Sequence, residues 1–457
     1  MLKATKLLGD RDIPETRTSV VVPTQPGASA AILPPLAEDV ARVPTMTIGV
    51  VGLGYVGLPT ALSLREAGHR VVGLDSSAAR IAAIRATDVD LLPVGMAALK
   101  ARAGDPELVL TTAPSLLAEC DAVIVCVPTP VTHRLVPDLG PLRGACETVV
   151  RHARIGQVVI LTSTTYVGCT RELLEGPLRQ RGLIPGEDVF IAFSPERIDP
   201  GVADHSPAST PRVVGGLTDR CLKEATRALS GTCPTLHAVS SPEAAELTKL
   251  LENTFRAVNI SMINEFSDVA QAMDLDITEV IDAAATKPYG FTAFRPGPGV
   301  GGHCIPCDPH YLLWQLQGER VQAPVIAAAM TGIARRPHTV VDRAREVLAG
   351  AGLTMQQAHV HVVGIAYKPD VADVRESPAL RIITELRSQG VQVSYSDHHV
   401  PTVDLGADVL VHQHPQDVPA DLYLVHTRHS DVDLTWLRGE RVLDATYTLA
   451  GLDAEVV

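Results

Sequence analysis

The sequence is poor in aromatic residues, carries a deficit of basic residues and has no long apolar run. Aromatic residues make up 4% of the 457 residues, which leaves few rings for stacking on nucleic-acid bases. The formal net charge is −13 at pH 7, whereas a surface that binds a phosphate backbone is basic. We therefore expect no nucleic-acid partner, although a small anionic ligand needs only a local positive field.

The absence of long apolar runs also bears on location. The longest apolar stretches have the length of a β-strand, and the opening MLKATKLLGDRD lacks the apolar core of a signal peptide. The eight cysteines are scattered and lack the spacing of a disulfide framework. These features predict a cytoplasmic protein without a membrane partner.

The length and pattern of the chain predict more than one domain. A chain of 457 residues exceeds one ordinary hydrophobic core, and 46% hydrophobic with 20% charged residues is a globular composition. Residues 1–44 contain six prolines and no sustained periodicity, so we expect a disordered extension there.

After residue 44, short apolar runs alternate with helix patterns. Runs that are apolar throughout are typical of strands buried on both faces of a parallel sheet. A helix is predicted at 59–67, where Gly68 ends it, and another at 377–389. Strands are predicted at 47–51, 70–74, 121–128, 156–164, 189–196 and 212–216, and again at 359–367, 391–397, 408–412, 422–427 and 441–445.

A helical segment separates these two halves. Apolar residues recur at helical spacing from Pro242 to Met273, with Ser241 as a candidate N-cap. Because they nearly encircle this helix, we expect a homodimer or higher homo-oligomer. A glycine-rich loop (295–309) and further helix (311–349) follow. The predicted fold is α/β, with two Rossmann-like doubly wound parallel-sheet domains joined by a long central helical segment.

A cofactor motif follows the first strand. Gly52, Gly54 and Gly57 form G-x-G-x-x-G between a predicted strand and helix, the context in which this string binds a dinucleotide. Asp75 ends the second strand, where a carboxylate accepts hydrogen bonds from ribose hydroxyls and repels a 2′-phosphate. The motif predicts NAD as the cofactor, although a structural turn with a solvated Asp75 would leave the same pattern.

The string HCIPCDPH (303–310) has four interpretations. Tetrahedral zinc draws its ligands from separated clusters, and no second CxxC or HxxxH accompanies this one, so we expect no metal. A redox CxxC normally opens a helix in a thioredoxin-like unit, which the preceding GPGVGG does not resemble. A catalytic thiol in a glycine-rich loop and a buried structural thiol both remain open.

Several motifs in order resemble the UDP-glucose / UDP-N-acetylhexosamine dehydrogenase family. They span about residues 46–450 and include VGLGYVGLP, CVPTP, STTYVG, FSPERI, ELTKLLENTFRAVNISMINE, KPYGFTAFRPGPGVGGHCIPCDPHYL and YKPDVADVRESP. GGHCIP and SPER are most similar to the N-acetylhexosamine branch. DATYTL (444–449) departs from the family pattern, because it lacks the arginine of the family's D-x-R.

The resemblance implies NAD-dependent oxidation of the C6 alcohol of a UDP-sugar to a carboxylate, with Cys304 as covalent nucleophile. It implies that Lys249 and Asn253, which share one helix face, hold the C6 oxygen and a water. Asp308 and Thr164 correspond to groups beside that water, and Glu196 to the base for thioester hydrolysis.

The resemblance also assigns contacts to ligands. Substrate contacts are expected at Glu196, Arg197, Lys249, Asn253, Gly301 and Lys368. Cofactor contacts are expected at Gly52, Gly54, Tyr55, Val56, Gly57, Asp75, Arg80, Pro128, Thr129, Thr164 and Arg375.

The implied domains are an NAD-binding domain (45–236), a central helical and dimerisation segment with the cysteine loop (237–350) and a nucleotide-sugar-binding domain (351–457). Three alternatives remain open. They are a UDP-glucose 6-dehydrogenase, a two-electron NAD dehydrogenase of the 6-phosphogluconate or 3-hydroxyacid type, and an inactive nucleotide-sugar-binding scaffold.

Overall fold

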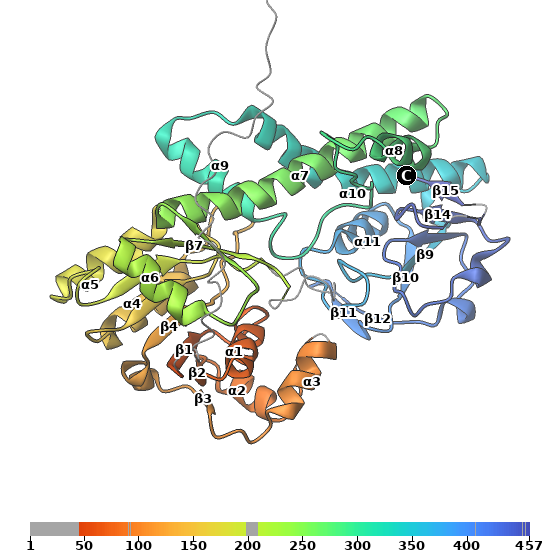
Figure 1. Ribbon diagram of the computed structural model, residues 1–457. Helices are drawn as coiled ribbons and strands as arrows, with labels where there is room; N and C mark the ends of the chain where they lie inside the picture. The colour runs from red at the N-terminus through yellow and green to blue at the C-terminus, as the bar shows by residue number, and fades with distance from the viewer. Residues whose placement is uncertain are drawn as a thin grey trace, which may run out of the picture.

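The computed structural model describes residues 45–457 except 90, 92, 198–208, 407, 450 and 453, so the expected extension over 1–44 lies outside the described residues. Two α/β lobes are joined by long helices that run from one lobe to the other (Figure 1). This arrangement confirms the predicted fold class. Among the described helices, none combines the length and apolar character needed to cross a membrane.

The first lobe is built on a sheet with the strand order β3-β2-β1-β4-β5-β6-β7-β8. β6 and β7 pair antiparallel, so β7 and β8 run against the other strands, a reversal that the strand pattern did not predict. The predicted strands are confirmed, and half-buried β3 and β8 are additional. The strands are β1 (Thr47–Val51), β2 (Arg70–Leu74), β3 (Leu108–Thr111), β4 (Ala122–Val125), β5 (Val158–Leu161), β6 (Phe190–Phe193), β7 (Arg212–Gly216) and β8 (Leu236–Val239).

Helices cover both faces of this sheet, which explains why its strands are apolar throughout. In β4, Val123 and Val125 enter one core cluster, while Ala122 and Ile124 enter the cluster on the opposite face. The helices are α1 (Gly57–Glu66), α2 (Ala78–Arg85), α3 (Pro93–Ala101), α4 (Gly140–His152), α5 (Gly176–Gln180) and α6 (Asp219–Leu229).

The central segment begins with the predicted long helix, α7 (Pro242–Ala272), which spans the two lobes in Figure 1. The Ser241 side chain accepts a hydrogen bond from the backbone N–H of Ala244, which confirms the predicted N-cap. The predicted helix at 311–349 is instead two helices. Arg320 takes a left-handed backbone conformation (φ 58°) that ends the first of them. The other helices here are α8 (Ile277–Ala285), α9 (Asp308–Glu319) and α10 (Pro324–Gly350).

The second lobe has a parallel sheet with the order β10-β9-β13-β14-β15, and α11 (Pro378–Ser388) packs beside it. The prediction that 408–412 joins this sheet is wrong. β12 (Val409–Val411) instead pairs antiparallel with β11 (Thr402–Asp404). Only Leu410 packs inward, while Val409 and Val411 are exposed, so this run lacks the burial on both faces that a strand inside a parallel sheet has. The sheet strands are β9 (His359–Val363), β10 (Gln392–Ser396), β13 (Leu422–Val425), β14 (Val442–Asp444) and β15 (Glu455–Val456).

Candidate active site

The turn between β1 and α1 has the shape of a dinucleotide cradle. Gly52 takes a φ of 88°, and a Cβ there would lie 2.6 Å from the carbonyl oxygen of Cys126. A Cβ on Gly57 would lie 1.8 Å from the carbonyl oxygen of Gly52, so this position admits only glycine. At Gly54 a Cβ would meet no described atom within 4 Å. The turn therefore packs tightly at its base and is open where a pyrophosphate would approach the helix N-terminus.

Polar groups from β2 and α2 hold this turn in place. The Asp75 carboxylate accepts hydrogen bonds from the backbone N–H groups of Leu53 and Ser77, both at 2.9 Å. The Arg80 Nε donates to the carbonyl oxygen of Leu53 at 2.9 Å. Arg80, which was expected to contact the cofactor, therefore supports the glycine turn. Each Asp75 oxygen keeps a lone pair for a ribose hydroxyl. These residues fit NAD.

The loop after β4 lies beside this cradle. The Ser163 hydroxyl accepts from the backbone N–H of Val127 at 2.9 Å and donates to its carbonyl oxygen at 2.8 Å. This pair joins the CVPTP and STTYVG motifs. It leaves Pro128 exposed and Thr129 buried in the loop where nicotinamide contacts were expected.

Cys304 lies in the loop between α8 and α9. The residue is exposed to solvent, although protein surrounds its thiol at longer range. That surrounding protein raises the pKa of the thiol to about 11, with a further rise from Asp308 and opposing contributions from Lys249, Arg256 and Arg375. The thiol is accessible, and cations face it that favour its thiolate form.

Asp308, Asn253, Lys249 and Thr164 gather beside this thiol. The Asn253 side-chain amide donates to Asp308 Oδ2 at 2.5 Å, which joins α7 to the first turn of α9. Burial raises the pKa of Asp308 to about 6, although Lys249 and hydrogen bonds from Asn253 and Thr164 oppose the rise. A carboxyl group with this pKa can take up and release a proton near neutral pH.

Glu196 and Arg197 lie apart from this group. Among the described residues, Glu196 pairs with the buried Arg212, its Oε2 lying 3.4 Å from a guanidinium nitrogen. Arg197 forms an ion pair with Glu252 of α7 and donates to the carbonyl oxygen of Pro211 at 3.2 Å. The structure therefore brings five of the six expected catalytic residues together and leaves Glu196 in a separate ion pair.

The loop after β9 closes the site from the second lobe. The backbone N–H of Gly302 donates to the carbonyl oxygen of Arg375 at 3.0 Å. A Cβ on Gly301 would lie 2.6 Å from Cβ of Tyr367, so this glycine permits loop packing. The Arg375 guanidinium lies 5.4 Å from the centre of the Tyr55 ring, which is cation–π distance, and so connects the second lobe to the glycine turn. Lys368 lies in the same loop.

Three residues that face the thiol or hold the family motifs in place were missed at the sequence level. Arg256 follows Asn253 by three positions and shares its helix face, a spacing that could have identified it. The buried Glu246 accepts hydrogen bonds from the backbone N–H groups of Gly168 (2.6 Å) and Thr170 (2.9 Å) and from the Thr170 hydroxyl. Arg336 donates to the carbonyl oxygen of Gly297 at 2.9 Å. These last two contacts join distant segments, so local spacing gave no indication of them.

Three segments of the chain match the UDP-glucose/GDP-mannose dehydrogenase family. Residues 46–230 match its NAD binding domain, 243–332 its central domain and 361–450 its UDP binding domain. Protein CapL of Staphylococcus aureus is 35% identical over 352 residues, which cover 77% of this chain and 81% of CapL. The UDP-N-acetyl-D-glucosamine 6-dehydrogenase of Pseudomonas aeruginosa is 35% identical over 367 residues, covering 79% and 84%.

A solved structure has the same fold. The UDP-D-ManNAc dehydrogenase of Pyrococcus horikoshii superimposes with a TM-score of 0.82 at 29% identity, covering 90% of this chain and 99% of that one. The similarity therefore extends over both lobes and the central helices.

Proposed function

Since the chain belongs to the UDP-glucose/GDP-mannose dehydrogenase family, we propose that it oxidises the C6 alcohol of a UDP-N-acetylhexosamine to the carboxylate. It is an NAD-dependent oxidoreductase acting on a UDP-sugar. The observation that carries the four-electron proposal is the accessible Cys304 thiol beside Lys249, Asn253 and Asp308.

The first oxidation removes the proton of the C6 hydroxyl group and a hydride from C6 itself. NAD, when bound, supplies the hydride acceptor. The Lys249 ammonium and the Asn253 amide stabilise the developing alkoxide, because both are buried and fixed donors act more strongly where water is excluded. The Asp308 carboxylate, to which the Thr164 hydroxyl is hydrogen-bonded, takes the proton, for which its raised pKa is suited.

The second oxidation proceeds through sulfur. The Cys304 thiolate adds to the aldehyde carbon, and protonation of the oxygen gives a thiohemiacetal. Loss of a second hydride and a proton gives a thioester. Water then cleaves the carbon–sulfur bond, which returns the thiol and releases the acid. The overall reaction consumes one water and two NAD per sugar and releases two NADH and three protons.

The ligand contacts proposed from the family pattern divide between the lobes. The glycine turn with Asp75, together with Pro128 and Thr129, would hold the cofactor, and Arg375 would reach it from the second lobe. Lys368 and Arg197 would contact the substrate. Glu196 would have to leave Arg212 to serve as base for thioester hydrolysis.

We assign the substrate to the N-acetylhexosamine branch. The SPER and GGHCIP motifs support this choice, and the relatives named for a substrate include UDP-N-acetyl-D-glucosamine and UDP-N-acetyl-D-mannosamine dehydrogenases. The proposed domains are 45–236, 237–350 and 351–457. We place the enzyme in the cytoplasm, because it requires NAD and carries a free catalytic thiol.

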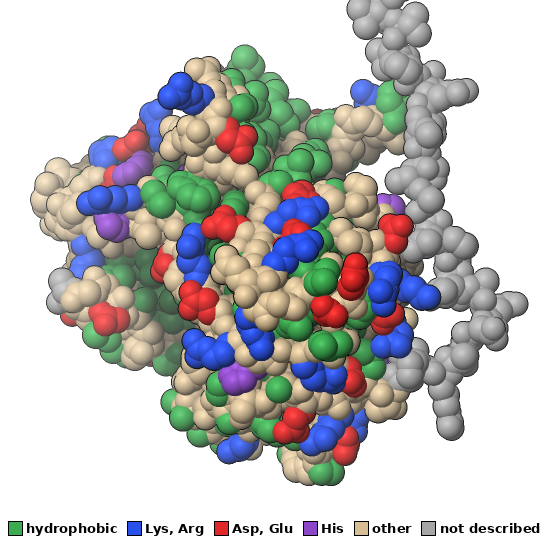
Figure 2. Space-filling model, turned by 90° about the vertical axis from the view of Figure 1, so that its left-hand side faces the viewer, with side chains coloured by type: hydrophobic (Ala, Val, Ile, Leu, Met, Phe, Trp, Pro, Cys, Tyr) green, Lys and Arg blue, Asp and Glu red, His purple; other side chains and the backbone are tan. Residues whose placement is uncertain are grey.

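A second copy of the chain is the proposed partner of α7. Along α7, seven apolar side chains that recur at helical spacing are exposed. On the face of the molecule seen in Figure 2, acidic and basic side chains are interspersed and form no large patch of one charge. An exposed apolar stripe of this length is typical of a protein interface. Its residues are Leu247, Leu251, Phe255, Met262, Phe266, Val269 and Met273.

A substrate panel tests the reaction. The purified full chain is incubated with NAD and with UDP-GlcNAc, UDP-ManNAc, UDP-glucose or UDP-galactose, while NADH absorbance and product mass are followed. We expect two NADH per sugar and an acid product with an N-acetylhexosamine. One NADH with a free aldehyde would refute the four-electron mechanism, and turnover of UDP-glucose alone would refute the substrate assignment.

A pair of cysteine variants tests the covalent step. Cys304→Ser should abolish acid formation, since serine is a far weaker nucleophile at neutral pH. Cys307→Ser is the matched control, because Cys307 is buried three residues away. Acid formation at the wild-type rate by Cys304→Ser would exclude the thioester.

A further inference from the structure

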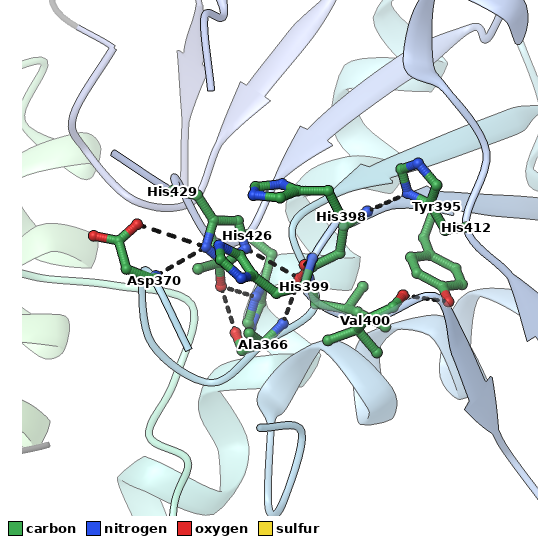
Figure 3. A network of polar contacts seen from close by, with 12 residues as sticks. Ala366, Asp370, Tyr395, His398, His399, Val400, His412, His426 and His429 are labelled. Carbon is green, nitrogen blue, oxygen red and sulfur yellow. Dashed lines mark hydrogen bonds and ion pairs between the residues drawn. The ribbon is translucent and has the colours of Figure 1, made fainter. Parts of the chain in front are cut away.

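A group of histidines and aspartates lies at the carboxyl ends of the strands of the second sheet (Figure 3). His398 and His399 follow β10, while His429 and Asp431 follow β13. Asp370 follows β9. The three parallel strands bring these side chains to their common carboxyl edge. Half of the chain's sixteen histidines belong to this lobe, namely His359, His361, His398, His399, His412, His414, His426 and His429.

The imidazole rings of three of these histidines are in close contact. The ring centres of His398 and His399 are 4.0 Å apart, and those of His399 and His429 are 4.5 Å apart. The His398 Nε2 lies 2.9 Å from Asp431 Oδ2. The His399 Nε2 is buried and has no hydrogen-bond partner among the described residues. A buried ring nitrogen without a partner is costly, so this atom has a lone pair or a proton left to bond with a ligand.

The remaining members of the group are already engaged. The His429 Nδ1 accepts a hydrogen bond from the backbone N–H of Asp370 at 2.9 Å, and its Nε2 lies 3.1 Å from Asp397 Oδ2. The Asp370 carboxylate accepts from the backbone N–H of Ser430 at 2.8 Å. In the set His398, His399 and Asp431, by contrast, the contact between His398 and Asp431 lies within the set, so an ion bound there would replace that contact and break no bond to another described residue.

The Asp397 carboxylate holds the turn that carries the two histidines. Asp397 Oδ1 accepts from the backbone N–H of His399 at 3.0 Å, and Asp397 Oδ2 accepts from those of Ile365 (2.8 Å) and Ala366 (2.9 Å). The turn that carries both histidines is therefore tied to the end of β9. Such support orients ligands before a metal arrives.

We propose that His398, His399 and Asp431 bind one divalent transition-metal ion of the zinc class. One ligand atom from each residue lies within 4.8 Å of the other two. Tetrahedral zinc with bonds of about 2.0–2.1 Å separates its ligand atoms by about 3.3 Å, so these atoms would approach one another by about 1.5 Å at most. Two imidazoles and one carboxylate suit zinc over calcium or magnesium, and a water completes the coordination.

The site is accessible, and its position gives it a structural role. The side chains of His398 and Asp431 are 42% and 59% exposed, which leaves a path for the ion. A bound ion would join the loop after β10 to the loop after β13. The latter holds Asp370 through Ser430, and Asp370 shares the loop after β9 with Arg375. Metal binding would therefore stabilise the second lobe and this loop.

Metal uptake by the full chain tests the proposal. Protein stripped with a chelator is titrated with Zn²⁺ by calorimetry, and with Co²⁺ while the visible spectrum is recorded. We expect saturable uptake of one ion per chain, the intense d–d bands of tetrahedral Co²⁺ and a higher Tm with zinc. Absence of stoichiometric uptake would overturn the proposal.

Surface variants locate the ligands. His398→Ala and Asp431→Asn alter exposed side chains and should weaken zinc binding by about tenfold or more while the fold persists. His338→Ala is the matched control, because it removes another exposed histidine paired with a carboxylate, Glu385. Zinc affinity that survives in His398→Ala and Asp431→Asn, or that is lost equally in His338→Ala, would overturn the assignment.

Discussion

Replacement of Asp308 by asparagine should stabilise the protein at neutral pH while it damages catalysis. The Asp308 carboxyl group is fully buried beside Lys249 and accepts a hydrogen bond from the Asn253 amide. Burial raises its pKa from 3.8 to about 6, so the ionised form is disfavoured in the folded state. An asparagine keeps the shape and an acceptor oxygen but cannot ionise.

The size of the effect follows from the linkage of protonation to folding. A group whose folded pKa lies above its unfolded pKa contributes stability that is present below the unfolded pKa and is lost as pH rises through the folded pKa. For Asp308 that window runs from about pH 4 to pH 6, and the full loss is about 3 kcal/mol. Between pH 5 and pH 7.5 the loss is roughly 1.4 kcal/mol.

Thermal unfolding of both proteins at pH 5, 6 and 7.5 measures this contribution. The Tm of Asp308→Asn relative to wild type should rise with pH, by about 2–4 °C for each kcal/mol in a domain of this size. Asp282→Asn, at an exposed aspartate, is the control and should follow the wild-type profile. Activity of Asp308→Asn should fall by about 100-fold or more, as for loss of a general base. A Tm difference that is constant with pH would refute the reasoning.

Three further perturbations address the cofactor turn, the packing of α7 and the oligomer. Gly57→Ala should lower the Tm sharply, because its methyl group would clash with the carbonyl oxygen of Gly52. Gly54→Ala should keep the Tm and lose affinity for NADH in a fluorescence titration. Equal behaviour of the two variants would contradict the assignment of this turn to the dinucleotide. Glu246→Gln should lower the free energy of unfolding by about 1–3 kcal/mol, since a buried backbone N–H loses its acceptor, and an unchanged denaturation midpoint would argue against this. Leu251→Asp should yield monomers in sedimentation, and a persistent dimer would move the interface away from α7.

Elements whose formation depends on residues close together in the chain were predictable from the sequence. The first strand, the glycine turn and the long helix with its Ser241 cap lie where the pattern indicated, because hydrophobic period and capping chemistry act within a few residues. The same reasoning failed at 408–412, where an apolar run pairs outside the main sheet, and at Arg320, where a left-handed residue divides a helix.

The family motifs named the reactive residues, but only the folded chain decides their surroundings. Cys304 was recognisable from its loop, whereas its exposure and the three cations that face it depend on how α7 and the second lobe pack. The pairing of Glu196 with Arg212 likewise joins the segment after β6 to the start of β7, which runs in the opposite direction, and no sequence spacing encodes that reversal.

The sequence by itself determined the order of the elements, the NAD turn and the position of the thiol, because each is written in neighbouring residues. Tertiary structure alone decided the reversed end of the first sheet and the gathering of His398, His399 and Asp431, since the two histidines and the aspartate come from separate loops. Side chains far apart in the chain meet only when strand order and register bring their loops to one edge of a sheet.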